Sequence, residues 1–204
     1  MLKRLFLMLL LVWPQPSQAE GMSEDQIKSG YVFNFVKFAE WPAGGGADDK
    51  VELCLVGRDV LGGALSALDG RKVGGRELHV VQYSSDSFLE RHSNSHREQE
   101  FKELHDATSH SAEQPKAHGE SGSCQVVFIG VSEQRRFVSI IKALGDSPAL
   151  TISDIENFAE KGGCIGLSYR EDKIVFEVNL ASTQKSGFRL PAQLLNLASY
   201  VFGR

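Results

Sequence analysis

The chain has 204 residues, of which 42% are hydrophobic and 24% are charged, and its formal net charge is −4. These proportions are typical of a folded globular domain and exclude an intrinsically disordered chain. The net negative charge also argues against nucleic acid as a partner, because binding to phosphates requires a basic face.

The N-terminus has the pattern of a cleaved export signal. Two basic residues precede an uninterrupted apolar run, Leu5–Trp13, which a proline ends. This run is too short to span a membrane, which takes roughly 20 residues. Ser17 and Ala19 are the small residues that signal peptidase requires at positions −3 and −1. We therefore predict a signal peptide over residues 1–19 and a periplasmic protein in which residues 20–204 form one α/β domain.

The capping-box pattern from Ser23 to Gln26 predicts that the first helix begins at residue 24 and runs to about residue 40. Its apolar residues cover more than one helix face, whereas a surface helix carries a single apolar stripe. Two interpretations stay open: the helix is buried on two sides, or it presents one face to a partner. In the second case the candidate contacts are Tyr31, Phe35 and Phe38 of this helix and Trp41, which follows it. The closing helical segment Leu194–Phe202 is the other candidate contact.

Strand and helix patterns then alternate along the chain, which predicts an α/β fold with a doubly wound, mainly parallel sheet and helices on both faces. We expect about six strands in the order 2-1-3-4-5-6, with an antiparallel hairpin at the C-terminal edge. Apolar runs place these strands at residues 51–56, 77–83, 125–129, 149–152, 164–169 and 173–180. Further helices are expected at residues 60–68, 133–144, 155–160 and 192–201, and residues 71–76 are expected to form a turn.

Three cysteines remain in an exported chain, so at least one has no partner within it. Cys54 lies on the first predicted strand and Cys124 directly precedes the third, and the expected strand order makes these two strands neighbours. We predict a disulfide between them, with Cys164 free and buried. Three unpaired buried cysteines are the alternative, because geometry decides whether two cysteines bond.

Open α/β sheets bind ligands outside the carboxyl ends of their strands, where the strand order reverses. In this chain that position follows the first and third predicted strands. Arg58 would pair with an anion there, and Asp154 would accept a hydrogen bond. We favour the alternative, in which Asp154 caps the next segment and Arg58 faces water. The candidate ligand-binding residues are Arg58, Asp59, Ser132 and Asp154.

A polar insertion at residues 84–123 holds five of the six histidines. We expect one irregular helix followed by a loose loop from about residue 107 to residue 122. His92 and His96 are four residues apart and would share a helix face, a spacing suited to zinc or copper. An ordinary solvated surface is the favoured alternative. The sequence contains no nucleophile elbow, zinc-protease motif or Walker loop, so we predict no catalytic residues, no enzyme activity and no cofactor.

Eight segments of the chain, taken in order, resemble the YfiR family of small periplasmic proteins, which includes the similar HmsC. The most specific segment is YVFNFVKFAEWP at residues 31–42. The others lie at residues 53–57, 70–76, 124–129, 150–154, 158–163, 176–180 and 194–198. The resemblance extends from about Ile27 to Val201 and is weakest in the insertion at residues 84–123.

The resemblance implies regulation. The best-known members of the family repress an inner-membrane diguanylate cyclase by binding its periplasmic domain, which lowers cyclic-di-GMP signalling and biofilm formation. A peptidoglycan-associated outer-membrane lipoprotein sequesters them and relieves the repression. Cys54 and Cys124 match the paired cysteines of the family, whereas Cys164 has no partner for the second bridge of some members. We expect the same two partners here, and a homodimer. The alternative function is a periplasmic sensor of a small ligand or a metal.

Overall fold

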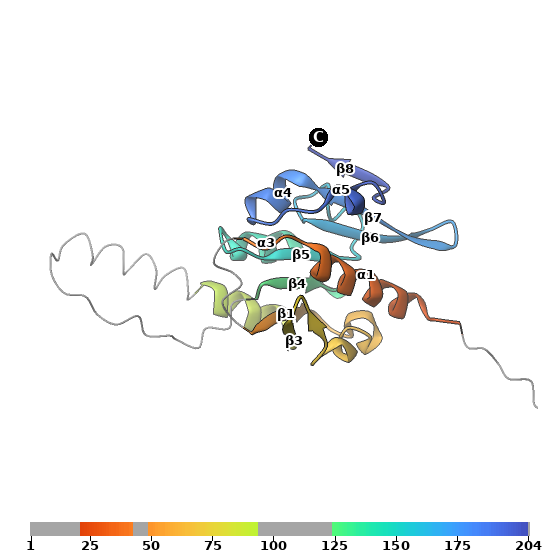
Figure 1. Cartoon of the computed structure of the whole chain (residues 1–204). Coiled ribbons are helices and arrows are strands. Elements are labelled where there is room, and N and C mark those ends of the chain that lie inside the picture. Colours follow the sequence, from red (N-terminus) through yellow and green to blue (C-terminus); the bar gives the residue numbers. More distant parts are fainter. Residues whose placement is uncertain (1–20, 43–48, 94–123, 204) are drawn as a thin grey trace, which may run out of the picture.

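The computed structural model describes residues 21–42, 49–93 and 124–203. One eight-stranded sheet runs through them in the order β2-β3-β1-β4-β5-β6-β7-β8 (Figure 1). Its six central strands have the predicted order. The strands are β1 (Lys50–Val56), β2 (Lys72–Val73), β3 (Arg76–Tyr83), β4 (Val126–Ile129), β5 (Leu150–Ser153), β6 (Ile165–Arg170), β7 (Lys173–Asn179) and β8 (Tyr200–Phe202).

The sheet is mainly parallel, as predicted. Strands β3, β1, β4, β5 and β6 pair in parallel, and β6 and β7 form the antiparallel hairpin. All residues of β4 and β5 are buried. Continuous apolar burial of this kind is what central parallel strands require, because both faces of the sheet are covered. The predicted α/β fold class is therefore confirmed.

Helices cover both faces of the sheet. They are α1 (Glu24–Phe38), α3 (Phe137–Leu144), α4 (Leu180–Lys185) and α5 (Ala192–Leu195), together with helical residues at 85–93 and 3₁₀ turns at Val60–Gly63, Ser66–Leu68 and Val131–Glu133. Helix α1, the first two 3₁₀ turns and α5 contribute to one apolar core cluster. Helix α3 and the helical segment at 85–93 contribute to the second cluster.

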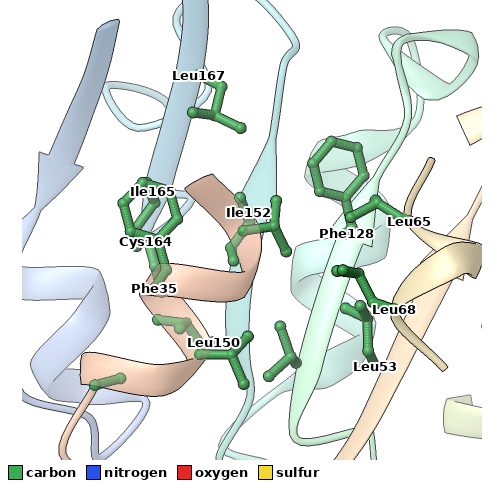
Figure 2. Close-up of a cluster of buried hydrophobic side chains, with 14 of the residues drawn as sticks. Phe35, Leu53, Leu65, Leu68, Phe128, Leu150, Ile152, Cys164, Ile165 and Leu167 are labelled. Atoms are coloured by element: carbon green, nitrogen blue, oxygen red, sulfur yellow. The ribbon is translucent and has the colours of Figure 1, made fainter. Parts of the chain in front are cut away.

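Phe35 anchors α1 to its face of the sheet. Its side chain is fully buried and meets the ring of Phe176 edge-on, with the ring centroids 5.0 Å apart. Figure 2 shows Phe35 on α1 over the sheet, close to Ile152 and Ile165, with Leu65 and Leu68 beside Phe128 and Leu53. This packing holds α1 against the middle of the sheet (Figure 1).

The capping box of α1 is confirmed. The Ser23 hydroxyl accepts a hydrogen bond from Gln26 N at 3.2 Å, and the Gln26 side chain accepts one from Ser23 N at 2.9 Å. The helix ends at Phe38, two residues earlier than predicted, because the backbone of Glu40 pairs with Arg189 in an antiparallel bridge.

The predicted helix at residues 192–201 is wrong. Only Ala192–Leu195 is helical, and Tyr200–Phe202 forms β8, which pairs in parallel with β7. Aromatic and β-branched residues such as these favour strands, and the edge of β7 offers them hydrogen-bond partners. The apolar pattern alone did not distinguish this strand from a last helical turn.

Four shorter predictions are also corrected. Residues 60–68 form two 3₁₀ turns instead of one helix, because Leu61 and Gly62 take left-handed backbone angles. Residues 155–160 form turns, not a helix. The predicted turn at 71–76 contains strand β2. A two-residue loop, Gly74 and Gly75, joins β2 to β3, and both glycines have positive φ. Tight hairpins favour glycine at both loop positions. The helix expected at 133–144 begins only at Phe137, after a 3₁₀ turn.

Candidate functional site

The disulfide between Cys54 and Cys124 is present, with the two Cα atoms 5.6 Å apart. It joins β1 to the segment just before the neighbouring strand β4, across 70 positions of sequence. Cys164 is free and buried, as predicted. A carboxylate oxygen of Glu52 lies 3.4 Å from the Cys54 sulfur and 3.8 Å from the Cys124 sulfur. While the disulfide is intact these sulfurs are not thiolates, so this group is not a metal site in the oxidised protein.

At the carboxyl ends of β1 and β4, Ser132 connects the two strands. Its hydroxyl accepts a hydrogen bond from Arg58 N at 3.0 Å and donates one to the Glu133 carboxylate at 3.1 Å. Gly57 has a φ of +119°, and a Cβ there would lie 2.6 Å from the Ser132 oxygen, so only glycine fits. The Arg58 and Asp59 side chains are exposed. The predicted ligand residues Arg58 and Ser132 thus meet through the Arg58 backbone rather than through its guanidinium group.

Asp154, the fourth predicted ligand residue, follows β5 and pairs with Lys28 of α1. The Lys28 ammonium lies 2.9 Å from Asp154 Oδ2 and 2.8 Å from Glu24 Oε1. The side chains of Lys28 and Asp154 are only 10% and 8% exposed. Burial alone would lower the pKa of Lys28, but its hydrogen bonds and charge interactions with Glu24 and Asp154 outweigh that effect and raise the pKa above its ordinary value.

The sequence prediction did not include Lys28. The one sequence signal was its position four residues after Glu24, a spacing that places two side chains on the same helix face. That spacing suggests a surface ion pair. The contact with Asp154, 126 positions away, requires the tertiary structure.

The aromatic residues proposed as partner contacts have unequal exposure. Phe35 lies in the core and is not accessible to a partner. Tyr31 packs on the same core and donates a hydrogen bond to the Ile174 carbonyl at 3.2 Å. Trp41 is partly buried against Phe188, with ring centroids 5.2 Å apart. Phe38 is 49% exposed.

Exposed apolar side chains also lie in the C-terminal segment 194–202, the other candidate contact. Leu197 is 74% exposed and Tyr200 is 56% exposed, while Leu194 is buried in the same core cluster as α1. Strand β8 ends the sheet order, so its outer edge pairs with no other strand of the described residues. We call Phe38, Leu197 and Tyr200 the apolar surface residues.

His92 is on the helical segment at 85–93, where its Nδ1 lies 2.9 Å from the Phe88 carbonyl oxygen. Its ring stacks on the Phe88 ring, with centroids 4.1 Å apart. His96 and the predicted loop at 107–122 lie outside the described residues, as does the signal peptide at 1–19, so the metal site and the signal peptide stay predictions. Within the described ranges, no helix has the length and hydropathy needed to cross a membrane.

The fold and the disulfide define a class: α/β proteins with a mainly parallel sheet, helices on both faces and a covalent link between two central strands. A family model described as YfiR/HmsC-like matches residues 25–199, and the chain belongs to this family. The resemblance inferred from the eight sequence segments is therefore confirmed. Membership supports a regulatory rather than an enzymatic role.

Two solved structures are similar to this chain in fold. A "conserved domain protein" from Vibrio cholerae O1 biovar eltor str. N16961 matches with a TM-score of 0.50 and 10% identity over 88% of this chain and 60% of its own length. An ABC domain in complex with L-Trp from Streptococcus pneumonia matches with a TM-score of 0.49 and 10% identity over 83% and 59%. The chain thus spans about three fifths of the length of these two proteins. The likeness to the Vibrio cholerae protein concerns the fold alone.

Proposed function

We propose that this protein is a periplasmic regulator that represses an inner-membrane diguanylate cyclase by binding the cyclase's periplasmic domain. Membership in the YfiR/HmsC-like family, over residues 25–199, is the observation that carries the proposal. Repression lowers cyclic-di-GMP and, with it, biofilm formation. A peptidoglycan-associated outer-membrane lipoprotein relieves the repression by sequestering the regulator, which acts as a homodimer.

The apolar surface residues Phe38, Leu197 and Tyr200 support a role in protein–protein contact. Each is a large side chain between 49% and 74% exposed. Phe38 ends α1 and Leu197 follows α5, whereas Tyr200 is on the edge strand β8. Aromatic side chains such as Phe38 and Tyr200 are enriched in protein interfaces. We assign the cyclase contact to these three residues.

The affinity of the mature protein for the periplasmic domain of the host's cyclase, measured by titration calorimetry, tests the proposal. We expect Leu197→Asp and Tyr200→Asp to weaken binding by roughly tenfold or more each, because a charge placed in an interface centre costs over 1 kcal/mol. Val138→Asp is the matched control, since Val138 is 54% exposed on α3, which covers the opposite face. It should bind like the wild type.

Two results would count against the proposal. Absence of binding by the wild-type protein to any of the host's periplasmic cyclase domains would refute repression by direct contact. Equal affinity of the wild type and both C-terminal variants would refute the assignment of the contact to the apolar surface residues.

A further inference from the structure

A small polar pocket of about 250 Å³ lies at the carboxyl ends of β5 and β6. The turn after β5 forms one wall, with Asp154 and Glu156, and the β6–β7 hairpin forms the other, with Ser168 and Glu177. Lys28 of α1 closes the pocket beside Asp154. Pockets for drug-sized ligands are usually larger, about 300–1,000 Å³, so this one suits a smaller molecule.

Two buried oxygen atoms of this pocket's residues make no hydrogen bond. Asp154 Oδ2 accepts from Lys28, but Asp154 Oδ1 has no donor within the described residues, although the side chain is 92% buried. Ser168 Oγ is also buried and without a partner in that part of the chain. Buried polar atoms of folded proteins nearly always have a partner, so each exception requires an explanation. Asp154 and Ser168, the residues that carry these two oxygens, both line the same pocket.

The charges around the pocket favour a cation. Asp154, Glu156 and Glu177 contribute three negative charges, whereas Lys28 and Arg170 contribute two positive charges. Both positive groups are already paired: Lys28 with Asp154 and Glu24, and Arg170 with Glu177 at 3.2 Å. A carboxylate oxygen without a donor therefore remains in a site of net negative charge.

We propose that this pocket binds a small molecule carrying a primary ammonium group, which donates hydrogen bonds to Asp154 Oδ1 and Ser168 Oγ. An ammonium group has three donors and no acceptor, which matches two unsatisfied oxygens and a negative site. A volume of 250 Å³ corresponds to about eight water molecules at ~30 Å³ each, enough for a short alkyl amine. Both oxygens are closed to solvent in the present conformation, so binding requires a local movement of the residues that line the pocket.

This site goes beyond the proposed function, and its test needs no partner protein. The mature, disulfide-bonded protein, labelled with ¹⁵N, is titrated with propylammonium chloride while amide NMR signals are recorded. Sodium chloride and 1-propanol at the same concentrations control for ionic strength and for the alkyl chain. We expect saturable shifts of residues 154–158 and 166–170 with propylammonium alone.

Two variants examine the two oxygens separately. Asp154→Asn and Ser168→Ala should each weaken propylammonium binding by at least fivefold. Ser168→Ala keeps the Lys28–Asp154 ion pair, so this variant alone tests whether the pocket binds the ammonium group if Asp154→Asn does not fold. Asp146→Asn and Ser139→Ala are matched controls, because both residues are exposed and far from the pocket lining, and they should bind like the wild type.

Three results would overturn the inference. Shifts that rise linearly without saturation mean that no amine site exists. Equal shifts with 1-propanol mean that the ammonium group is not recognised. Unchanged binding by Ser168→Ala and any folded Asp154→Asn protein means that other groups bind the amine, and that trapped water satisfies the two oxygens.

Discussion

Replacing Lys28 with methionine removes the ammonium group that joins α1 to the turn after β5, while it keeps most of the side-chain volume. Lys28 lies 2.9 Å from Asp154, and both side chains are at least 90% buried. The substitution leaves the Asp154 carboxylate in the protein interior without a cation. It does not disturb the apolar contacts of Phe35 or the disulfide.

The expected loss of unfolding free energy is large because the Asp154 carboxylate loses its partner but stays buried, away from water. Breaking a buried ion pair by removing one member costs about 3–5 kcal/mol of unfolding free energy. Glu24, the second partner, is 45% exposed, so water compensates it and it adds little to the loss. We therefore expect Lys28→Met to lose about 3 kcal/mol or more.

Urea denaturation of the oxidised protein, followed by circular dichroism, measures this loss. Lys37→Met is the matched control, because Lys37 is exposed near the end of the same helix, and it should change stability by no more than about 0.5 kcal/mol. The double variant Lys28→Met/Asp154→Leu should regain stability relative to Lys28→Met, since no unpaired charge remains. A loss for Lys28→Met as small as that of Lys37→Met would refute the reasoning.

Three further predictions also concern the stability of the folded protein. Gly163→Ala should lose about 1–3 kcal/mol in urea denaturation, because its Cβ would overlap the Phe158 ring; an unchanged midpoint would show that the ring moves freely. Replacing both Cys54 and Cys124 with serine should lose about 4 kcal/mol, since their disulfide constrains 70 positions of the unfolded chain; wild-type protein assayed with a reductant should match the variant. The Lys28 pKa is raised in the folded protein, so the stability from its ion pair is present below the unfolded pKa of about 10.4 and is lost as pH rises through the folded pKa. Wild-type stability should therefore fall toward that of Lys28→Met above about pH 10.4, and a gap that stays constant would contradict the pKa argument.

The core of the sheet was predictable because its strands carry strong local signals. Apolar runs such as Val126–Ile129 are buried on both faces, so their composition alone indicates central parallel strands. The order of the six central strands followed from the alternation of strands and helices. Cys54 and Cys124 are neighbours because that order is correct.

The edges of the sheet and the ion pair were not predictable from local signals. Tyr200–Phe202 becomes a strand only because β7 offers it an edge, and a three-residue strand has no periodicity of its own. Leu61 takes a left-handed conformation that its residue type does not favour, so tertiary contacts impose it. The partner of Lys28 lies 126 positions away, beyond the reach of a spacing argument.

Topology predicted the positions of the polar candidate residues, whereas the exposure of the aromatic candidates depends on packing. Asp154 and Ser132 do lie at the carboxyl edge of the sheet, where parallel topology places strand ends. Phe35 was selected for the same apolar character that buries it in the core. An apolar helix face predicts burial, and only the structure shows that Phe38 remains half exposed.

The most direct test of the central claim is the cyclic-di-GMP content of the native host with and without this gene. The account predicts a clear rise on deletion. A copy that carries residues 1–204 should reverse the rise, and a copy without residues 1–19 should not, since the proposed repression requires export to the periplasm. An unchanged cyclic-di-GMP level after deletion, both with and without envelope stress, would contradict the claim that this protein represses a diguanylate cyclase.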